Sequence, residues 1–308
     1  MAPMRPTRGF RLLALAAAGA AWALVAVGGV VRVTESGLGC PDWPLCDGRV
    51  VPAQAKEPLI ETSHRWVAGL VSLLVLAVAV WAWRRYRARA DLLVPAVVAA
   101  ALVPAQALLG AIVVWLELPG WIVAWHFLVG MLFLAATVLT AGAAWRGGSG
   151  LPASVGFVRL AWTAVGAGLA LVALGAAVVS ADADHACGRS WPDCNGSFAA
   201  GGPDAWLQVA HRSAAYLVAA LALALAALAW RGYGPRLAAS APLAAVVLQL
   251  AFGISLVLAG EESGAHDALA MLHVAGAGAV WAALVGLAAL VGLPLRAPLP
   301  AGLPARAR

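Results

Sequence analysis

Residues 61–65 read Glu61-Thr62-Ser63-His64-Arg65, and 147 positions later the chain reads Gln208-Val209-Ala210-His211-Arg212. The same interval of 147 residues separates His126 from His273. Similarity at a fixed interval indicates an internal repeat. Because this repeat carries two pairs of histidines with it, it predicts a duplicated metal or haem site.

The composition places this repeat in a membrane. Of the 308 residues, 63% are hydrophobic and 11% are charged, and the mean hydropathy is +0.89. A soluble domain cannot bury that much apolar surface. About 20 apolar residues cross the hydrocarbon core of a bilayer. The long apolar runs therefore predict eight transmembrane helices, at about residues 9–31, 58–83, 91–116, 121–145, 156–180, 204–230, 236–260 and 267–293.

Charge placement predicts the orientation of these spans. Fourteen of the 20 basic residues precede the first span, follow an even-numbered span or lie in the tail, whereas of the 14 acidic residues only Asp91 lies on that side. The positive-inside rule then predicts that both termini are cytoplasmic. The net charge of +6 reflects this asymmetry and does not indicate nucleic-acid binding. Residues 5–31 have too long an apolar run for a signal peptide, so we expect this span to be retained.

These patterns predict an all-α integral membrane protein. Eight transmembrane helices would form two tandem four-helix bundles related by a pseudo-twofold axis. We expect one bundle in residues 1–150 and the other in residues 151–308.

All four cysteines lie in two long loops on the side opposite the arginines. Cys40 and Cys46 enclose one Trp-Pro sequence, and Cys187 and Cys194 enclose another. In an oxidising compartment two close cysteines most simply form a disulfide within their loop. We therefore predict the pairs Cys40–Cys46 and Cys187–Cys194, and a redox-active pair is the alternative.

The four histidines are expected at one depth. His64, His126, His211 and His273 each lie a few residues inside the outer end of an even-numbered span, about 10 Å deep at 1.5 Å per residue. Ionisable side chains within spans usually face the bundle interior. Two histidines per half are too few for a structural zinc site. They suffice as the two axial ligands of a b-type haem, whose porphyrin supplies four nitrogens.

Two neighbouring positions refine this prediction. Arg65 and Arg212 each follow a predicted ligand, and their charges suit either a haem propionate or a lipid phosphate. Glu61 lies one helical turn before His64, where the second half has the neutral Gln208. A desolvated carboxyl beside a haem can exchange protons, whereas an amide cannot. We therefore expect different work from the two halves.

With these motifs the chain resembles the haem A synthase family of bacterial membranes, over about residues 8–293. The resemblance rests on the 61–65 motif, on His211-Arg212, and on residues 31–44, which read Val31-Arg32-Val33-Thr34-Glu35-Ser36-Gly37-Leu38-Gly39-Cys40-Pro41-Asp42-Trp43-Pro44. It implies a bacterial plasma-membrane enzyme with its haem sites toward the extracytoplasmic side. The implied reaction oxidises the C8 methyl group of haem O, through the alcohol and the hydrated aldehyde, to the formyl group of haem A. Haem A then equips a terminal oxidase.

The resemblance also implies roles for single residues. His64 and His126 would hold the substrate haem, His211 and His273 a permanent haem b, and Glu61 would be the catalytic carboxylate. Cys40 and Cys46 fall on the functional loop pair of the family. Expected partners are a haem O synthase that delivers the substrate, a quinone as electron acceptor and a second copy of the chain, within the lipid bilayer.

Two other classes of function also fit parts of the pattern. A diheme b-type electron carrier, such as a quinol-linked cytochrome b, has the same four ligands. Such a carrier usually places its haems near opposite membrane faces, whereas these histidines share one depth. A transporter could use histidines in a proton path, but transporter repeats are often inverted, and four helices per half make these repeats parallel.

Overall fold

The computed structural model describes residues 5–146, 150–198, 201–260 and 262–292. Within these ranges the chain forms eight long helices and two short 3-10 helices, η1 (Ser36–Leu38) and η2 (Ala183–His185), and no strand. Each long helix has the length and hydropathy needed to cross a membrane. They are α1 (Arg8–Val33), α2 (Lys56–Tyr86), α3 (Ala90–Trp115), α4 (Gly120–Arg146), α5 (Val155–Ser180), α6 (Pro203–Trp230), α7 (Arg236–Ala259) and α8 (His266–Val291).

The predicted spans agree with these helices to within a few residues. The largest difference is at α2, which begins at Lys56 and ends at Tyr86, because polar residues at both ends continue the helix beyond its apolar run. Residue 293, the predicted end of the last span, lies outside the described residues, as do the tail arginines Arg296, Arg306 and Arg308.

The helix starts preserve the repeat. Thr7 caps α1 by accepting a hydrogen bond from the backbone N–H of Phe10, and Ser154 caps α5 by accepting one from Phe157. Hydroxyl side chains are favoured at this position because they satisfy an N–H that has no partner within the helix. Phe10 and Phe157 are both fully buried, so each cap fixes an aromatic anchor at the base of its helix.

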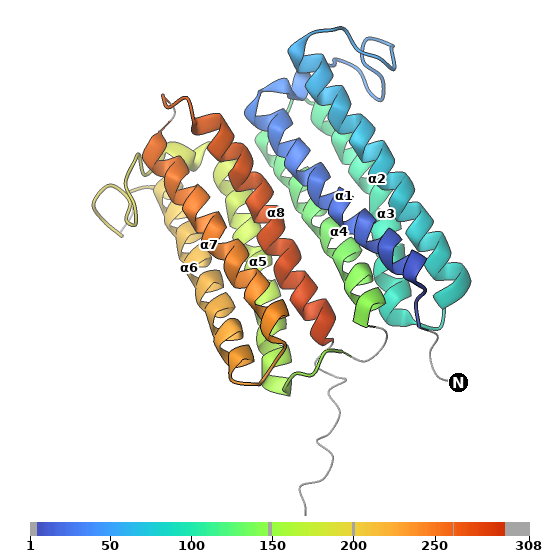
Figure 1. The fold of residues 1–308 in the computed structure, drawn as a ribbon. Coiled ribbons are helices and arrows are strands. Elements are labelled where there is room, and N and C mark those ends of the chain that lie inside the picture. Colours follow the sequence, from blue (N-terminus) through green and yellow to red (C-terminus); the bar gives the residue numbers. More distant parts are fainter. Residues whose placement is uncertain (1–4, 147–149, 199–200, 261, 293–308) are drawn as a thin grey trace, which may run out of the picture.

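The helices pack as two sets (Figure 1). In the first set α1 and α3 each contact both α2 and α4, and in the second α5 and α7 each contact both α6 and α8. One buried cluster lies mainly in the first set and reaches α5 and α8, and the other lies in the second set; both are made largely of alanine, valine and leucine. Small side chains allow helices in a membrane to approach closely, where packing rather than water exclusion drives association.

Helix α8 joins the two sets. It contacts α1 and α4 of the first set as well as α5 and α7 of its own. Two indole N–H groups donate hydrogen bonds across this interface, from Trp22 to the carbonyl of Ala275 (3.0 Å) and from Trp281 to the carbonyl of Met131 (2.7 Å). A Cβ added at Gly29 would lie 3.0 Å from the Cβ of Val274, so α1 and α8 are in close contact.

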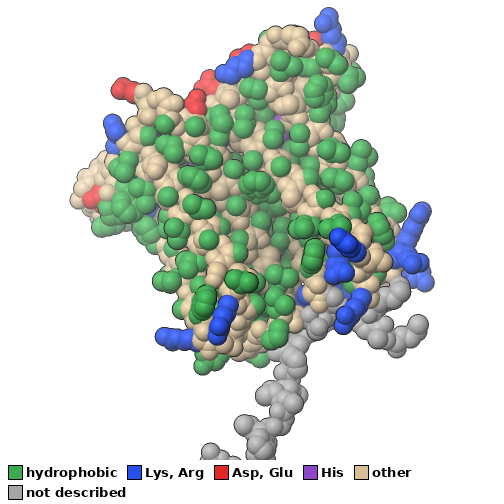
Figure 2. Space-filling view, in the orientation of Figure 1, with side chains coloured by type: hydrophobic (Ala, Val, Ile, Leu, Met, Phe, Trp, Pro, Cys, Tyr) green, Lys and Arg blue, Asp and Glu red, His purple; other side chains and the backbone are tan. Residues whose placement is uncertain are grey.

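Charged residues gather at the two ends of the molecule (Figure 2). Acidic side chains are seen at the end that carries the long loops, and arginines dominate the end at which α1 begins. Asp91 is the one acidic residue on the arginine side, and it pairs with Arg89 (2.7 Å) and Arg146 (3.0 Å). The pair with Arg146 links the start of α3 to the end of α4, and the pair with Arg89 lies within the start of α3.

Candidate functional site

The structure places the four histidines at matching positions near the loop ends of their helices. His64, His126, His211 and His273 lie within the first nine residues of α2, α4, α6 and α8, about 9–12 Å from the helix start at 1.5 Å per residue. His64 and His126 are close enough to interact electrostatically, and so are His211 and His273. The two members of each predicted pair therefore lie near each other within one helix set.

A glycine on the preceding helix, called a notch glycine below, lies against each imidazole. A Cβ added at Gly28, Gly110, Gly175 or Gly253 would lie 3.3, 3.5, 3.1 or 2.9 Å from Cε1 of His64, His126, His211 or His273, respectively. The distances at Gly28 and Gly175 are tighter than usual, and the distance at Gly253 leaves no room for a methyl group, whereas the distance at Gly110 is an ordinary van der Waals contact. The ring positions thus depend on α1, α3, α5 and α7 as well as on the helices that carry the histidines.

The donor set suits haem. In the described part of the chain, no three histidine, cysteine or acidic side chains cluster as metal ligands would. Each half offers two imidazoles, and a porphyrin would supply the other four nitrogens. The buried Nδ1 atoms of His64, His126 and His211 have no hydrogen-bond partner. These three rings therefore keep a buried nitrogen that a bound group could use.

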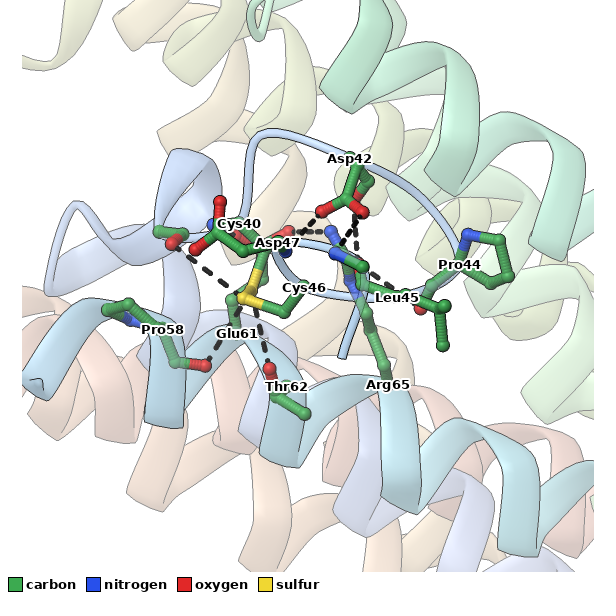
Figure 3. Close-up of a disulfide and its surroundings, with 12 residues drawn as sticks. Cys40, Asp42, Pro44, Leu45, Cys46, Asp47, Pro58, Glu61, Thr62 and Arg65 are labelled. Atoms are coloured by element: carbon green, nitrogen blue, oxygen red, sulfur yellow. Dashed lines mark hydrogen bonds and ion pairs between the residues drawn. A yellow bond between two sulfur atoms is a disulfide. The ribbon is translucent and has the colours of Figure 1, made fainter. Parts of the chain in front are cut away.

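Glu61 is held in place by two elements beside the first histidine pair. Its side chain is buried on α2, one turn before His64. Oε2 accepts a hydrogen bond from the backbone N–H of Cys40 (2.8 Å), and Oε1 accepts one from Arg65 (Figure 3). The carboxylate is therefore fixed by both the loop and its own helix.

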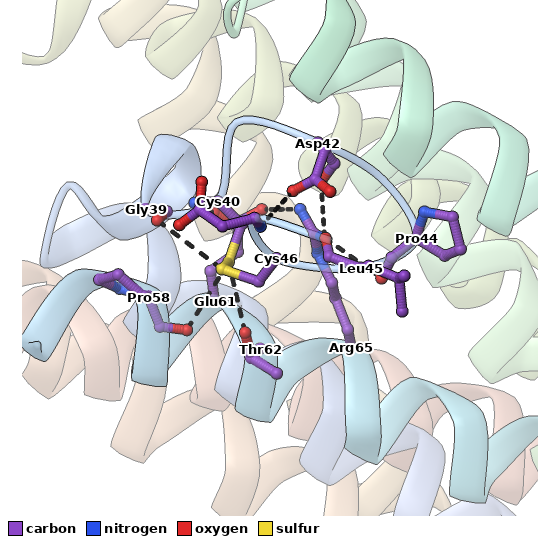
Figure 4. Close-up of polar contacts among 11 residues, drawn as sticks. Gly39, Cys40, Asp42, Pro44, Leu45, Cys46, Pro58, Glu61, Thr62 and Arg65 are labelled. Carbon is purple, nitrogen blue, oxygen red and sulfur yellow. Dashed lines mark hydrogen bonds and ion pairs between the residues drawn. A yellow bond between two sulfur atoms is a disulfide. The ribbon is translucent and has the colours of Figure 1, made fainter. Parts of the chain in front are cut away.

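Arg65 holds the first loop against α2 through hydrogen bonds. Its Nη1 donates to the carbonyls of Asp42 (2.8 Å), Leu45 (2.5 Å) and Pro44 (3.3 Å), while Nη2 pairs with Glu61 (Figure 4). The planar guanidinium group carries five N–H donors and can serve several acceptors at once. Both predicted partners of this arginine, a propionate and a lipid phosphate, would have to share it with the loop.

Arg212 has the same role in the second half. Its Nη1 donates to the carbonyls of Ser190 (2.9 Å) and Asp193 (2.5 Å) in the second loop. Gln208, the counterpart of Glu61, donates instead to the carbonyl of Asp184 (3.0 Å). The second half therefore keeps the arginine that holds the loop carbonyls, which we call the arginine clamp. It has a neutral hydrogen-bond donor in place of the carboxylate.

The disulfides join the cysteines within each loop, in agreement with the predicted pairing of Cys40 with Cys46 and of Cys187 with Cys194. Both bridges are buried. Cys40 Sγ lies 3.3 Å from the hydroxyl of Thr62, the residue after Glu61. The first disulfide thus lies directly against the helix that carries Glu61 and His64.

An aspartate orders the turn that follows the first disulfide. The carboxylate of Asp42 accepts hydrogen bonds from the backbone N–H groups of Asp47 (2.6 Å) and Gly48 (2.8 Å). These donors, the one from Gly48 foremost, hold the pKa of Asp42 below its ordinary value. Asp42 is therefore ionised at neutral pH, and its carboxylate holds the turn through these two hydrogen bonds.

Sequence reasoning missed the four glycines on α1, α3, α5 and α7 and the two glutamines on α3 and α7. Gln106 donates to the carbonyl of His126 (3.0 Å), and Gln249 donates to that of His273 (2.9 Å). Both glutamines lie four residues before a notch glycine, and the two pairs are 143 residues apart, which differs from the histidine interval. An alignment of α3 with α7 on their own interval would have found them.

Together, the helices and the site define a multi-pass helical membrane protein with a duplicated pair of intramembrane histidines. The family model of cytochrome oxidase assembly proteins, COX15-CtaA, matches residues 11–285. The chain therefore belongs to the COX15-CtaA family.

Curated relatives carry the name haem A synthase. The chain is 36% identical to that of Halalkalibacterium halodurans over 249 residues, which are 76% of this chain and 82% of the relative. It is 31% identical to that of Bacillus licheniformis over 249 residues, 77% of this chain and 82% of the relative. It is 35% identical to that of Shouchella clausii over 210 residues, 64% and 68% of the two chains.

Proposed function

We propose that this protein is a haem A synthase, an oxidoreductase that converts the C8 methyl group of haem O into the formyl group of haem A for terminal oxidase assembly. Membership of the COX15-CtaA family and the names of the curated relatives support this function. They do not favour the alternative of a diheme electron carrier. The observation that carries the division of labour is Glu61, fixed beside His64, with Gln208 in its place in the second half.

The proposed sites follow the two helix sets. Residues 1–150 would form the substrate bundle, in which His64 and His126 hold haem O, and residues 151–308 would form the cofactor bundle, in which His211 and His273 hold haem b. The glycine notches and the unpartnered Nδ1 atoms support this fit. Haem b, when bound, supplies a one-electron redox centre.

The reaction makes specific demands on the chain. Conversion of a methyl group to a formyl group with water as the oxygen source releases four electrons and four protons. A membrane quinone is our candidate for the final electron acceptor. Glu61 is the acid–base group in this proposal, because a positioned carboxylate can accept a proton that the amide of Gln208 cannot. Cys40 and Arg65 orient that carboxylate through their hydrogen bonds.

We further propose that the two sets are tandem bundles related by a pseudo-twofold axis, in a bacterial plasma membrane. The arginine-rich end and both termini would face the cytoplasm, as the positive-inside rule predicts. The haem sites would then lie toward the extracytoplasmic side, where an oxidising environment supports the two disulfides. A haem O synthase would supply the substrate, and a homo-oligomer is the assembly we propose.

The direct test is to express the chain in a bacterium that makes haem O but lacks haem A. Haems are extracted with acidic acetone and separated by chromatography. We expect a formyl-bearing haem with the retention and spectrum of haem A. Unchanged haem O, in cells that contain the folded protein at normal levels, would contradict the proposal.

A further inference from the structure

Helices α3 and α7 each place a glutamine and a glycine next to the histidine of the following helix. Each has a glutamine followed four residues later by a notch glycine, Gln106 with Gly110 and Gln249 with Gly253. Residues four apart lie on one face of a helix. The glycine admits the imidazole ring, and the glutamine reaches the backbone of the same histidine.

The glutamine oxygens are buried without partners. Oε1 of Gln106 and Oε1 of Gln249 both lack a hydrogen bond, and so does Nδ1 of His126. A buried polar group without a partner destabilises the folded state. In the first half, Oε1 of Gln106 and Nδ1 of His126 therefore both lack partners, although the amide nitrogen of Gln106 already donates to the carbonyl of His126.

The iron-binding form of the histidine decides how these groups pair. An imidazole that binds a metal through Nε2 carries its hydrogen on Nδ1, so Nδ1 needs an acceptor. The amide nitrogen of Gln249 already lies 3.1 Å from Nδ1 and 3.3 Å from Nε2 of His273. In the ligand-competent tautomer, the amide atom that faces Nδ1 must be the oxygen.

The other two histidines have no such amide. The residues four before their notch glycines, Gly28 on α1 and Gly175 on α5, are Leu24 and Leu171. Each helix set therefore pairs one histidine that contacts a glutamine with one that has a leucine at this register, and in the second half His211 has a hydrogen bond to the backbone of Leu171 instead. This contrast recurs in both halves, although the halves differ at Glu61 and Gln208.

We infer that Gln106 and Gln249 are positioning residues for the axial ligands of the two proposed haems. Each would hold the carbonyl of its histidine through the amide N–H and accept a hydrogen bond from Nδ1–H through the amide oxygen. Such an acceptor fixes the ring orientation and raises the basicity of the ligand. The haem in each half would then have one ligand, on α4 or α8, whose ring is fixed by a glutamine. The inference rests on the haem sites of the proposed function.

The second half offers the cleaner test, because its haem is a resident cofactor. Gln249→Met keeps the length of the side chain but removes both amide groups, and Gln249→Glu keeps an oxygen acceptor. Leu171→Met is the matched control at the register of the other ligand. The purified proteins are compared by haem content, by redox titration of the haem and by the electron paramagnetic resonance spectrum of the oxidised state.

We expect Gln249→Met to bind haem b about 10–100-fold more weakly, the usual effect of losing such a partner. The haem that remains should have a higher midpoint potential, because a less basic imidazole stabilises ferric iron less. Gln249→Glu should retain haem and shift the potential downward, and Leu171→Met should change neither. Equal potentials in the wild type and Gln249→Met would overturn the inference, as would equal shifts in all three variants.

One more variant separates this inference from the proposed function. His273→Ala should abolish haem b binding. If the haem persists unchanged in that variant, the proposed site is wrong and the inference falls with it. If haem binding depends on His273 but its potential does not respond to Gln249, only the inference is wrong.

Discussion

At the scale of single residues, α2 and α6 differ in one group near their histidines, which is a carboxyl on α2 and an amide on α6. Glu61 and Gln208 have similar size and both bond to the loop above them, but Glu61 accepts hydrogen bonds where Gln208 donates one. A proton can therefore be taken up in one half and not in the other. This difference could be read directly from the repeat.

Replacing Glu61 with Gln tests the role of that charge. The variant should fold and bind haem in both halves, because its amide has nearly the same shape. Conversion of haem O to haem A should fall by about 10²–10⁴-fold, the usual effect of losing a positioned acid–base group. The measurement is chromatography of extracted haems at matched protein level. Gln208→Ala is the control and should have a far smaller effect; equal losses would refute the proposed division of labour.

The notch glycines provide a second test at this scale. Gly253→Ala places a methyl group 2.9 Å from Cε1 of His273, so the ring must move and haem b content should fall clearly. Gly69→Ala is the matched control, because a Cβ at Gly69 on α2 meets nothing within 4 Å and alanine favours a helix. Haem per protein is measured by the pyridine haemochrome spectrum. Full haem content in Gly253→Ala would show that the notch is not needed.

At the scale of elements, each loop is fastened to the helix that follows it. A disulfide closes the loop and an arginine of the helix holds its carbonyls, Arg65 in the first half and Arg212 in the second. In the first half the loop also donates a hydrogen bond to a carboxylate of the following helix, from Cys40 to Glu61, where the second half has the amide of Gln208. The first loop is thus tied to the proposed chemistry as well as to the fold.

Serine substitution in the two disulfides separates these functions. A ring this small stabilises a protein by about 2–3 kcal/mol, so both double variants should unfold at a moderately lower temperature. Haem A formation should fall further in Cys40→Ser/Cys46→Ser than in Cys187→Ser/Cys194→Ser. The first disulfide holds the loop whose backbone N–H, at Cys40, positions Glu61. Thermal unfolding in detergent and haem chromatography provide the two measurements. Equal activity in both variants would leave the first disulfide with a purely structural role.

The sequence predicted these elements unevenly, for physical reasons. Hydropathy located all eight helices, because a membrane span must be apolar along its whole length. The cysteine pairs followed from proximity in the chain. Gln106, Gln249 and the notch glycines were missed because their importance depends on which helix faces which histidine, and only packing decides that. The arginine clamps were missed because loop carbonyls leave no pattern in a sequence.

At the scale of the whole molecule, the histidines of α6 and α8 form the proposed cofactor site. Changing His211 or His273 to alanine should remove haem b, because an iron with one axial imidazole left is weakly held. The reduced spectrum should lose its b-type band, while circular dichroism still reports helices. The same change at His64 or His126 should spare haem b and block haem A formation. Full haem content after both His211 and His273 are replaced would refute the assignment.

The tight contact of α8 with α1 and α4 also bears on why both sets belong to one polypeptide. Two identical four-helix subunits could form such an interface as a symmetric dimer, but symmetry would copy every substitution into both sites. Gene fusion removes that constraint. Once the copies are covalently joined, Glu61 can persist in one while its counterpart becomes Gln208, and each site can specialise without loss of the other.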